Sequence, residues 1–227
     1  MKNKFPDKLK AVLFDMDGVI YDSMPNHVIS WVETFHAFGL VIPESWAYMQ
    51  EGRTGESSVQ LVFAEQRDRK ATKEETEAMY KLKCELFAAR PKAEVMPGIR
   101  ELFAKVKESK LDATIVTGSG QKTLLNKLNT DFPGMFQKEL LVTAFDVKHG
   151  KPNPEPYLRG LGKLNVSAEE AIVIENAPLG IQAARAAGVF TVAVNTGPLP
   201  DQVLLDAGAN MIFHSLTELS DKWETLF

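Results

Sequence analysis

The chain has 227 residues, of which 44% are hydrophobic and 25% are charged, a composition typical of a globular protein. Its formal net charge of -4 gives no sign of general nucleic-acid binding, and its single cysteine excludes an internal disulfide framework. No apolar run approaches the roughly 20 residues that a membrane-spanning helix needs, so we expect a cytoplasmic protein with no membrane partner and no nucleic-acid partner.

The first predicted element is a strand at Ala11–Phe14, where four apolar residues follow one another without alternation. Such a run is typical of a strand that is covered on both faces, as in a parallel sheet. Asp15 and Asp17 follow directly, and Gly18 allows a tight turn beside them. Two carboxylates this close repel each other unless a cation lies between them or one is protonated. The stretch predicts an Mg²⁺ site or an aspartate nucleophile, and an acidic turn without chemistry is the alternative.

The segment 22–94 has no buried-strand pattern of its own. Apolar residues recur in it at helical spacing, first over 28–38. The charge run at 65–77 is interpreted as the solvated face of a helix. We therefore predict a helical unit at 22–94, inserted into a core domain made of 1–21 and 95–227.

From residue 95 onward, predicted helices and strands alternate. The predicted strands are Asp112–Val116, Leu140–Thr143, Ala171–Ile174, Phe190–Val194 and Met211–Phe213, and the predicted helices are Ile99–Ser109, Lys122–Asn129, Glu155–Leu164, Leu179–Ala187 and a short terminal helix. This alternation is typical of an α/β fold with a doubly wound parallel sheet.

Polar residues follow four of the predicted strands. They are Asp15 and Asp17, then Thr117-Gly118-Ser119, then Lys151, then Glu175-Asn176. Because the carboxyl ends of parallel strands share one edge of the sheet, we expect these groups to converge. Carboxylates, hydroxyls, backbone N–H groups and an ammonium together suit phosphoryl transfer. Taken singly, the last three groups have plainer alternatives, which are a helix cap, a surface charge and an ordinary strand end.

On these motifs the chain resembles the haloacid dehalogenase superfamily, in the branch with a helical cap inserted after the first motif. The matching residues are Asp15-Met16-Asp17-Gly18 for the first motif, Thr117 for the second, Lys151 for the third and Glu175-Asn176 for the fourth. The resemblance covers essentially the whole chain.

The resemblance implies that Asp15 is the nucleophile and forms an aspartyl phosphate. Asp17 would be the general acid for the leaving group and then the base that activates water. The residues implied to hold the phosphoryl group are Thr117, Gly118, Ser119 and Lys151. Dehalogenase members lack an acid at the position of Asp17, so a phosphatase or a phosphomutase is implied.

The resemblance also implies a Mg²⁺ cofactor, bound by Asp15, by the backbone oxygen of Asp17 and by the fourth motif. That motif usually reads Glu-Asp, whereas here it reads Glu175-Asn176. Either the amide oxygen of Asn176 or the carboxylate of Glu175 then takes the ligand position.

Relatives resembling β-phosphoglucomutase carry a cap arginine that clamps the second phosphate of a sugar bisphosphate. Gly55 stands at that position here. Arg53 is the nearby arginine, and it would contact the second phosphate from a different distance. His27 resembles the mutase histidine that assists proton transfer, and a helix residue without chemistry is the alternative. Lys83 resembles a cap lysine that contacts substrate, and a surface charge is the alternative.

Glu51 stands where a mutase-like protein has a basic residue. Together with Asn176 it resembles a bacterial branch that hydrolyses inorganic pyrophosphate, and a surface position for Glu51 is the alternative. The function implied is an inorganic pyrophosphatase with pyrophosphate as its small-molecule partner. The alternatives are a β-phosphoglucomutase-like phosphomutase, a small sugar-phosphate phosphatase and a non-catalytic phosphate-binding module.

Overall fold

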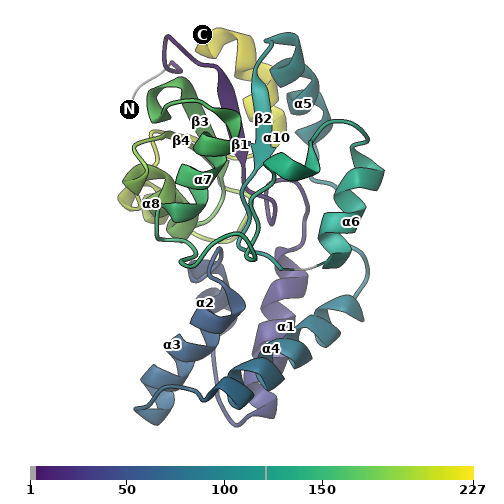
Figure 1. The fold of residues 1–227 in the computed structure, drawn as a ribbon, viewed down its shortest axis with the longest axis vertical. Helices are drawn as coiled ribbons and strands as arrows, with labels where there is room; N and C mark the ends of the chain where they lie inside the picture. Colours follow the sequence, from purple (N-terminus) through teal and green to yellow (C-terminus); the bar gives the residue numbers. More distant parts are fainter. Residues whose placement is uncertain (1–3, 121) are drawn as a thin grey trace.

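A parallel sheet forms the centre of the computed structural model, which describes residues 4–120 and 122–227 (Figure 1). Its strands are β1 (Ala11–Phe14), β2 (Asp112–Ile115), β3 (Ala171–Glu175), β4 (Phe190–Val194) and β5 (Met211–Phe213). They lie in the order β2-β1-β3-β4-β5, and every neighbouring pair is parallel. The predicted α/β fold is confirmed.

Strand β1 is covered on both faces, as its unbroken apolar run predicts. Val12 and Phe14 belong to the apolar cluster on one face, and Ala11 and Leu13 belong to the cluster on the other. All four side chains are fully buried. Because β1 lies between β2 and β3, the residues that follow it are held from both sides.

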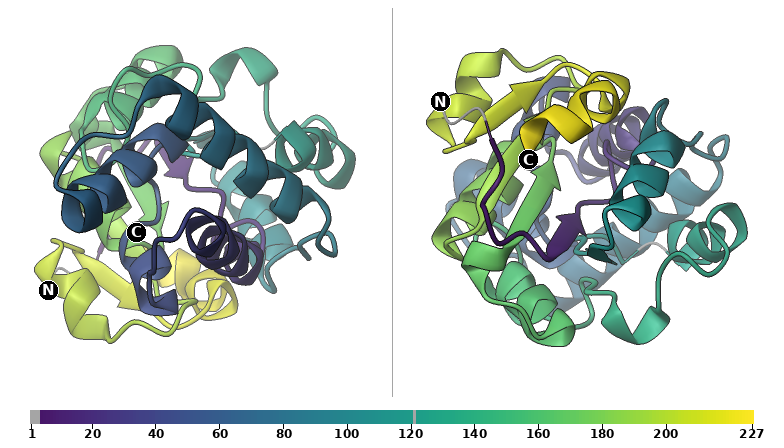
Figure 2. Two further views of the ribbon diagram at one scale, coloured as in Figure 1. Left: turned by 90° about the horizontal axis from the view of Figure 1, so that it is seen from below. Right: turned by 90° about the horizontal axis from the view of Figure 1, so that it is seen from above.

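Helices cover both faces of the sheet, as the two end-on views show (Figure 2). They are α5 (Ile99–Glu108), α6 (Lys122–Asp131), α7 (Glu155–Leu164), α8 (Pro178–Ala186), α9 (Asp201–Asp206) and α10 (Leu216–Lys222). Short 3₁₀ turns occur at Lys138–Leu140, Ala168–Glu170 and Trp223–Leu226. Helix α9 has no counterpart among the predicted elements, because six residues are too few to show a helical period.

Two predictions about local structure were wrong. The segment Leu140–Thr143 is not a strand and makes only a single parallel bridge, between Val142 and Val116. The Asp146 carboxylate accepts hydrogen bonds from both the backbone N–H (2.8 Å) and the hydroxyl (2.7 Å) of Thr143, and this turn competes with the sheet ladder. The charge run at 65–77 is not one helix face, because it includes the turn between two helices.

Four helices form a separate group beyond the carboxyl ends of the strands (Figure 1). They are α1 (Met24–Ala37), α2 (Glu44–Met49), α3 (Gly55–Arg67) and α4 (Lys73–Ala88). This helical group has its own apolar cluster, made of Phe35, Leu40, Ile42, Val59, Val62, Phe63, Ala71 and Met79. A capping box between Thr72 and Glu75 starts α4 in the middle of the charge run.

The chain passes between the sheet and the helical group twice, and the two crossings are hydrogen-bonded to each other. The Asp22 N–H donates to the Glu94 carbonyl at 2.9 Å, and the Met96 N–H donates to the Ile20 carbonyl at 2.9 Å. The division at 22 and 94 stays a prediction, and residues 1–3 of its first segment lie outside the described residues.

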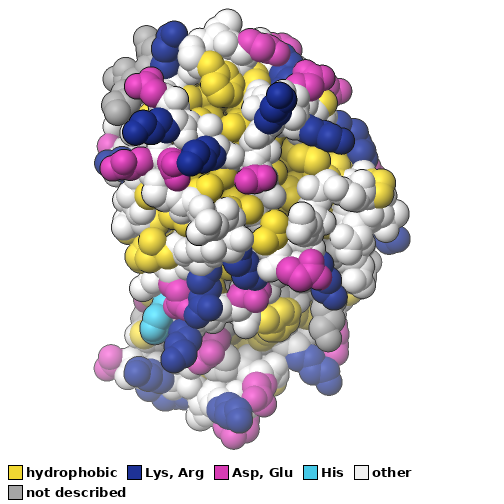
Figure 3. Space-filling model, turned by 45° about the horizontal axis from the view of Figure 1, so that its top comes forward, with side chains coloured by type: hydrophobic (Ala, Val, Ile, Leu, Met, Phe, Trp, Pro, Cys, Tyr) yellow, Lys and Arg dark blue, Asp and Glu magenta, His cyan; other side chains and the backbone are white. Residues whose placement is uncertain are grey.

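On the face drawn in Figure 3, basic and acidic side chains are interspersed. Among the helices of the described residues, none combines the length and the apolar character that crossing a membrane requires.

Helix α7 offers a matched pair of glycines for testing how tightly it packs on the sheet. A Cβ at Gly160 would lie 2.7 Å from Leu13 Cδ2 and 2.9 Å from Val116 Cγ2, whereas a Cβ at Gly162 would meet nothing within 4 Å. We expect Gly160→Ala to lower the free energy of unfolding by about 1–3 kcal/mol through overpacking. Gly162→Ala should raise it by up to about 1 kcal/mol through helix propensity. Urea denaturation measures both, and equal effects would contradict this packing.

Candidate active site

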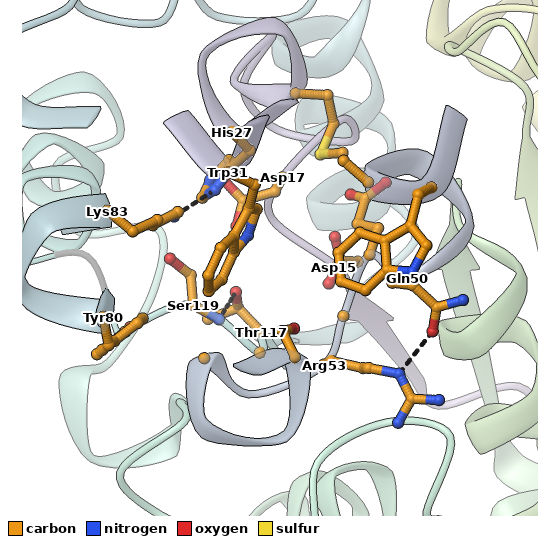
Figure 4. Close-up of a pocket in the computed structure, with 18 residues that line it drawn as sticks. Asp15, Asp17, His27, Trp31, Gln50, Arg53, Tyr80, Lys83, Thr117 and Ser119 are labelled. Carbon is orange, nitrogen blue, oxygen red and sulfur yellow. Dashed lines mark hydrogen bonds and ion pairs between the residues drawn. The ribbon is translucent and has the colours of Figure 1, made fainter. Parts of the chain in front are cut away.

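Polar residues that follow β1 and β2 line a cavity between the sheet and the helical group (Figure 4). The cavity has a volume of about 60 Å³, room for a few water-sized groups. The predicted site residues that line it are Asp15, Asp17, His27, Glu51, Lys83, Thr117, Gly118 and Ser119. Lys151, Glu175 and Asn176 are not part of its lining, and they are linked to the lining residues by the contacts described below.

Lys151 is a buried charge rather than a surface one, with 1% of its side chain exposed. Its Nζ contacts Asp15 Oδ1 and donates to Glu175 Oε1 at 2.6 Å. Burial alone would lower the pKa of Lys151, but the charges of Asp15 and Glu175 hold that pKa well above its usual value. The side chain therefore stays an ammonium and places one positive charge at the end of β1.

Glu175 anchors this lysine with both of its oxygens engaged. Oε1 accepts from Lys151 and from the Tyr157 hydroxyl, the latter at 2.8 Å. Oε2 accepts from the backbone N–H groups of Asn176 (2.9 Å) and Ala177 (3.0 Å). Tyr157 is a site residue that sequence reasoning missed, because an aromatic residue on the apolar side of a helix is read as core.

The Asp15 carboxyl is almost fully buried, with 4% exposed. Burial raises its pKa well above the usual value, Lys151 opposes that shift, and the charges of Glu175 and Asp17 add to it. A divalent cation beside Asp15 would favour its ionised form. The excess of carboxylates at this end of the sheet is therefore chemically suited to a metal ion.

Asn176 is the residue that best fits the missing metal ligand. Its Oδ1 is buried and makes no hydrogen bond to any part of the chain that the structure describes. Oxygen donors from Asp15, Asp17 and this amide suit Mg²⁺. Within residues 4–120 and 122–227, no group of three or more His, Cys, Asp or Glu side chains is arranged to hold a metal. Which oxygens would bind a metal here stays a prediction.

Asp17 is held by two donors from the first helix and the residue before it. The Ser23 hydroxyl donates to Asp17 Oδ1 at 2.6 Å, and His27 Nε2 lies 3.1 Å from the same oxygen. Burial would raise the pKa of Asp17, but His27 and Ser23 hold it below the usual value. Both contacts fall on the same oxygen, Oδ1, of the Asp17 carboxylate. Ser23 was not among the predicted residues.

Lys83 fixes the orientation of His27. Its Nζ lies 2.8 Å from His27 Nδ1, and its side chain is buried, so it is not a surface charge (Figure 4). An ammonium has hydrogen atoms to donate and no lone pair to accept with. Nδ1 of His27 must then be the acceptor, and Nε2 carries the proton that points at Asp17. Burial lowers the pKa of Lys83 to about 8.

The turn after β2 supplies hydroxyl and backbone donors. Thr117 Oγ1 accepts from the Ser119 N–H at 2.9 Å, and both side chains are buried against the cavity. Gly118 lies directly under Gly52 of the helical group, because a Cβ there would be 2.4 Å from the Gly52 carbonyl oxygen.

Glu51 faces the core site rather than solvent. Its Oε2 accepts from Asn176 Nδ2 at 3.2 Å, across the junction between the helical group and the sheet. Burial raises the pKa of Glu51 well above its usual value, and the charges of Asp15 and Glu175 add to the shift. Arg53 instead turns toward Gln50, with Nε donating to Gln50 Oε1 at 2.7 Å (Figure 4).

Comparison with known proteins places the chain in a family. Residues 9–188 match the model described as haloacid dehalogenase-like hydrolase. The chain belongs to the haloacid dehalogenase-like hydrolase family. It is 28% identical over 203 residues to "Phosphorylated carbohydrates phosphatase" of Thermotoga maritima, covering 88% of this chain and 92% of that one.

Two further proteins are similar to this chain over nearly its full length. "Beta-phosphoglucomutase" of Bacillus subtilis is 26% identical over 229 residues, covering 95% of this chain and 96% of that one. A solved structure named "Putative beta-phosphoglucomutase from Bacteroides vulgatus" is 56% identical, with a TM-score of 0.93, covering 96% of this chain and 89% of that one.

The buried ammonium of Lys83 makes a testable contribution to the pH dependence of stability. Its folded-state pKa of about 8 lies below the ordinary value of 10.5, so between these values the folded chain binds fewer protons than the unfolded chain. This group therefore makes the free energy of unfolding rise with pH in that window. Between about pH 7.5 and pH 10, the stability of the wild type relative to Lys83→Met should rise by about 1–3 kcal/mol. Urea denaturation at each pH checks this, and a constant difference would contradict a buried Lys83 with a lowered pKa.

Proposed function

We propose that this protein is a Mg²⁺-dependent phosphohydrolase that works through an aspartyl phosphate on Asp15. The observation that supports it best is the buried Lys151 ammonium, which holds Asp15 Oδ1 and Glu175. That contact leaves Asp15 Oδ2 as the attacking oxygen. When bound, Mg²⁺ would neutralise charge on the phosphoryl oxygens and on Asp15.

The residues of the chain suit two successive displacements. In the first, Asp15 Oδ2 bonds to phosphorus, the bond to the leaving oxygen breaks, and Asp17, carrying the proton that it took from water in the preceding turnover, donates that proton to the leaving oxygen. Lys151, the Thr117 hydroxyl and the nearby backbone N–H groups hold the other phosphoryl oxygens. In the second, Asp17 takes a proton from a water molecule that attacks the same phosphorus, and Asp15 is released with inorganic phosphate.

The relatives support one class of substrate. The names of the Thermotoga and Bacillus proteins refer to phosphorylated carbohydrates and to phosphoglucose, and neither refers to pyrophosphate. A sugar-phosphate phosphatase or phosphomutase is therefore the second candidate function for this chain.

The geometry supports a shorter substrate, and we propose inorganic pyrophosphate. The cavity of about 60 Å³ leaves little room for a sugar ring. Position 55, where the mutase arginine is expected, is a glycine covered by the Tyr80 ring. Glu51 adds a carboxyl group to the lining of this cavity and takes up space there. The raised pKa of Glu51 favours its protonated form, which can lie beside a second phosphate without repulsion.

The substrate experiment compares phosphate release from pyrophosphate, β-glucose 1-phosphate, glucose 6-phosphate, phosphoglycolate and p-nitrophenyl phosphate, with Mg²⁺ and with EDTA. Asp15→Asn serves as the blank. We expect pyrophosphate to lead by at least about tenfold in kcat/KM, equivalent to about 1.4 kcal/mol. Glu51→Gln should then reduce turnover of pyrophosphate more than turnover of p-nitrophenyl phosphate. A sugar phosphate in the lead would favour the second candidate, and no Mg²⁺-dependent turnover at all would favour a phosphate-binding module.

Removal of the Asn176 amide tests the metal assignment without relying on turnover. Because its Oδ1 is a buried oxygen without a partner in the described chain, Asn176→Ala should weaken Mg²⁺ binding about tenfold or more in isothermal titration calorimetry. Asn129→Ala, at an exposed position on α6, is the matched control. Unchanged Mg²⁺ affinity in Asn176→Ala would assign the ligand role elsewhere.

A further inference from the structure

Three glycines line the contact between segment 52–54 of the helical group and the catalytic loops. They are Gly52, Gly118 and Gly150, which we call the glycine seam. A Cβ at Gly118 would lie 2.4 Å from Gly52 O, and a Cβ at Gly52 would lie 2.8 Å from Lys151 Cδ. A Cβ at Gly150 would lie 2.8 Å from Thr54 Cγ2 and 3.2 Å from Thr54 N. At each position, a side chain would occupy space that the opposite part of the molecule already fills.

Gly150 is the clearest case, because its backbone does not itself require glycine. Gly52 adopts a φ of +88°, whereas Gly150 is not among the described glycines with positive φ. The three atoms nearest to its absent Cβ all belong to segment 52–54. The close approach of segment 52–54 therefore explains why position 150 has no side chain.

This close approach governs the space that a substrate has. Gly150 directly precedes Lys151, and segment 52–54 directly follows Glu51. The separation across the seam therefore sets how near Glu51 comes to Asn176, which is 3.2 Å here. It also sets the small volume of the cavity above Asp15.

We propose that Gly150 is a specificity-determining residue, which lets segment 52–54 seat so closely on the Lys151 loop that only short phosphate compounds are enclosed. The proposal deepens the proposed function and rests on its phosphoryl-transfer chemistry, but it does not require pyrophosphate as the substrate. A methyl group at position 150 would hold the helical group away from the catalytic loops. The cavity would then admit bulky leaving groups and hold short ones less well.

Thr54 provides a compensating change. Its Oγ1 accepts from the Ser57 N–H at 3.3 Å and caps α3, while its Cγ2 points at Gly150. Thr54→Ser retains the capping hydroxyl and removes the atom nearest to the new methyl group. The next contact, to Thr54 N at 3.2 Å, calls for a shift of only a few tenths of an ångström.

The experiment measures kcat/KM for acetyl phosphate and pyrophosphate as short substrates, and for p-nitrophenyl phosphate as a bulky one. In Gly150→Ala, we expect the ratio of p-nitrophenyl phosphate to acetyl phosphate to rise at least about tenfold, mainly through a higher KM for the short substrates. Thr54→Ser in the same chain should return the ratio most of the way to the wild-type value. Gly162→Ala, where a Cβ meets nothing within 4 Å, should leave it unchanged.

The outcomes separate this proposal from its alternatives. An equal loss of kcat/KM for all three compounds would mean that the added methyl group disturbs Lys151 itself. An unchanged ratio would mean that the seam does not select substrates. Either result overturns the proposal. A wild type that prefers sugar phosphates would overturn both this proposal and the pyrophosphate assignment, whereas a wild type that prefers acetyl phosphate to pyrophosphate would overturn only the pyrophosphate assignment. Small-angle scattering with Mg²⁺ and inorganic phosphate adds a readout that is independent of turnover. Gly150→Ala and Gly118→Ala should both have a larger radius of gyration than the wild type, and equal radii would contradict the seam.

Discussion

The buried ammonium of Lys151 is the constraint on which the rest of the site depends. Two carboxylates, Asp15 and Glu175, could not lie together in the interior without a positive charge between them. Glu175 at the end of β3 accepts a hydrogen bond from the lysine, and Glu175 is itself held by the Tyr157 hydroxyl and by the backbone N–H groups of Asn176 and Ala177. One oxygen of Asp15 is thereby fixed, and under the proposed function the other oxygen would be the nucleophile.

A second chain of contacts controls the other aspartate. Lys83, buried in the helical group, determines which nitrogen of His27 carries the proton, and His27 with Ser23 holds one oxygen of Asp17. Asp17, the acid–base group of the proposed function, is thus positioned by contacts with Ser23 and His27. The glycine seam brings the same helical group down onto the Lys151 loop. Proton transfer and the size of the substrate would both depend on how closely the two parts approach.

Much of this was predictable from the sequence, for identifiable physical reasons. Strands buried on both faces appear as unbroken apolar runs, so β1, β3 and β4 were located closely, and parallel pairing brings the residues after them to one edge. The segment Leu140–Thr143 was predicted wrongly because the hydrogen bonds from Thr143 to Asp146 are a local competitor that apolar pattern does not reveal. Tyr157 and Ser23 were missed because their roles depend on side-chain contacts that the sequence pattern does not show. Tyr157 donates a hydrogen bond to Glu175, and Ser23 donates one to Asp17. The hydrogen bonds that the Glu175 carboxylate accepts likewise became visible only in the folded structure.

The most direct test of the account is a search for the phosphorylated aspartate. The protein is mixed with substrate and Mg²⁺, quenched in acid within a single turnover, digested and examined by mass spectrometry. The account predicts the mass of one added phosphoryl group on the peptide that contains Asp15, and its loss in Asp15→Asn together with turnover. A phosphoryl group on another residue, or turnover that survives Asp15→Asn undiminished, would contradict the placement of Asp15 as nucleophile.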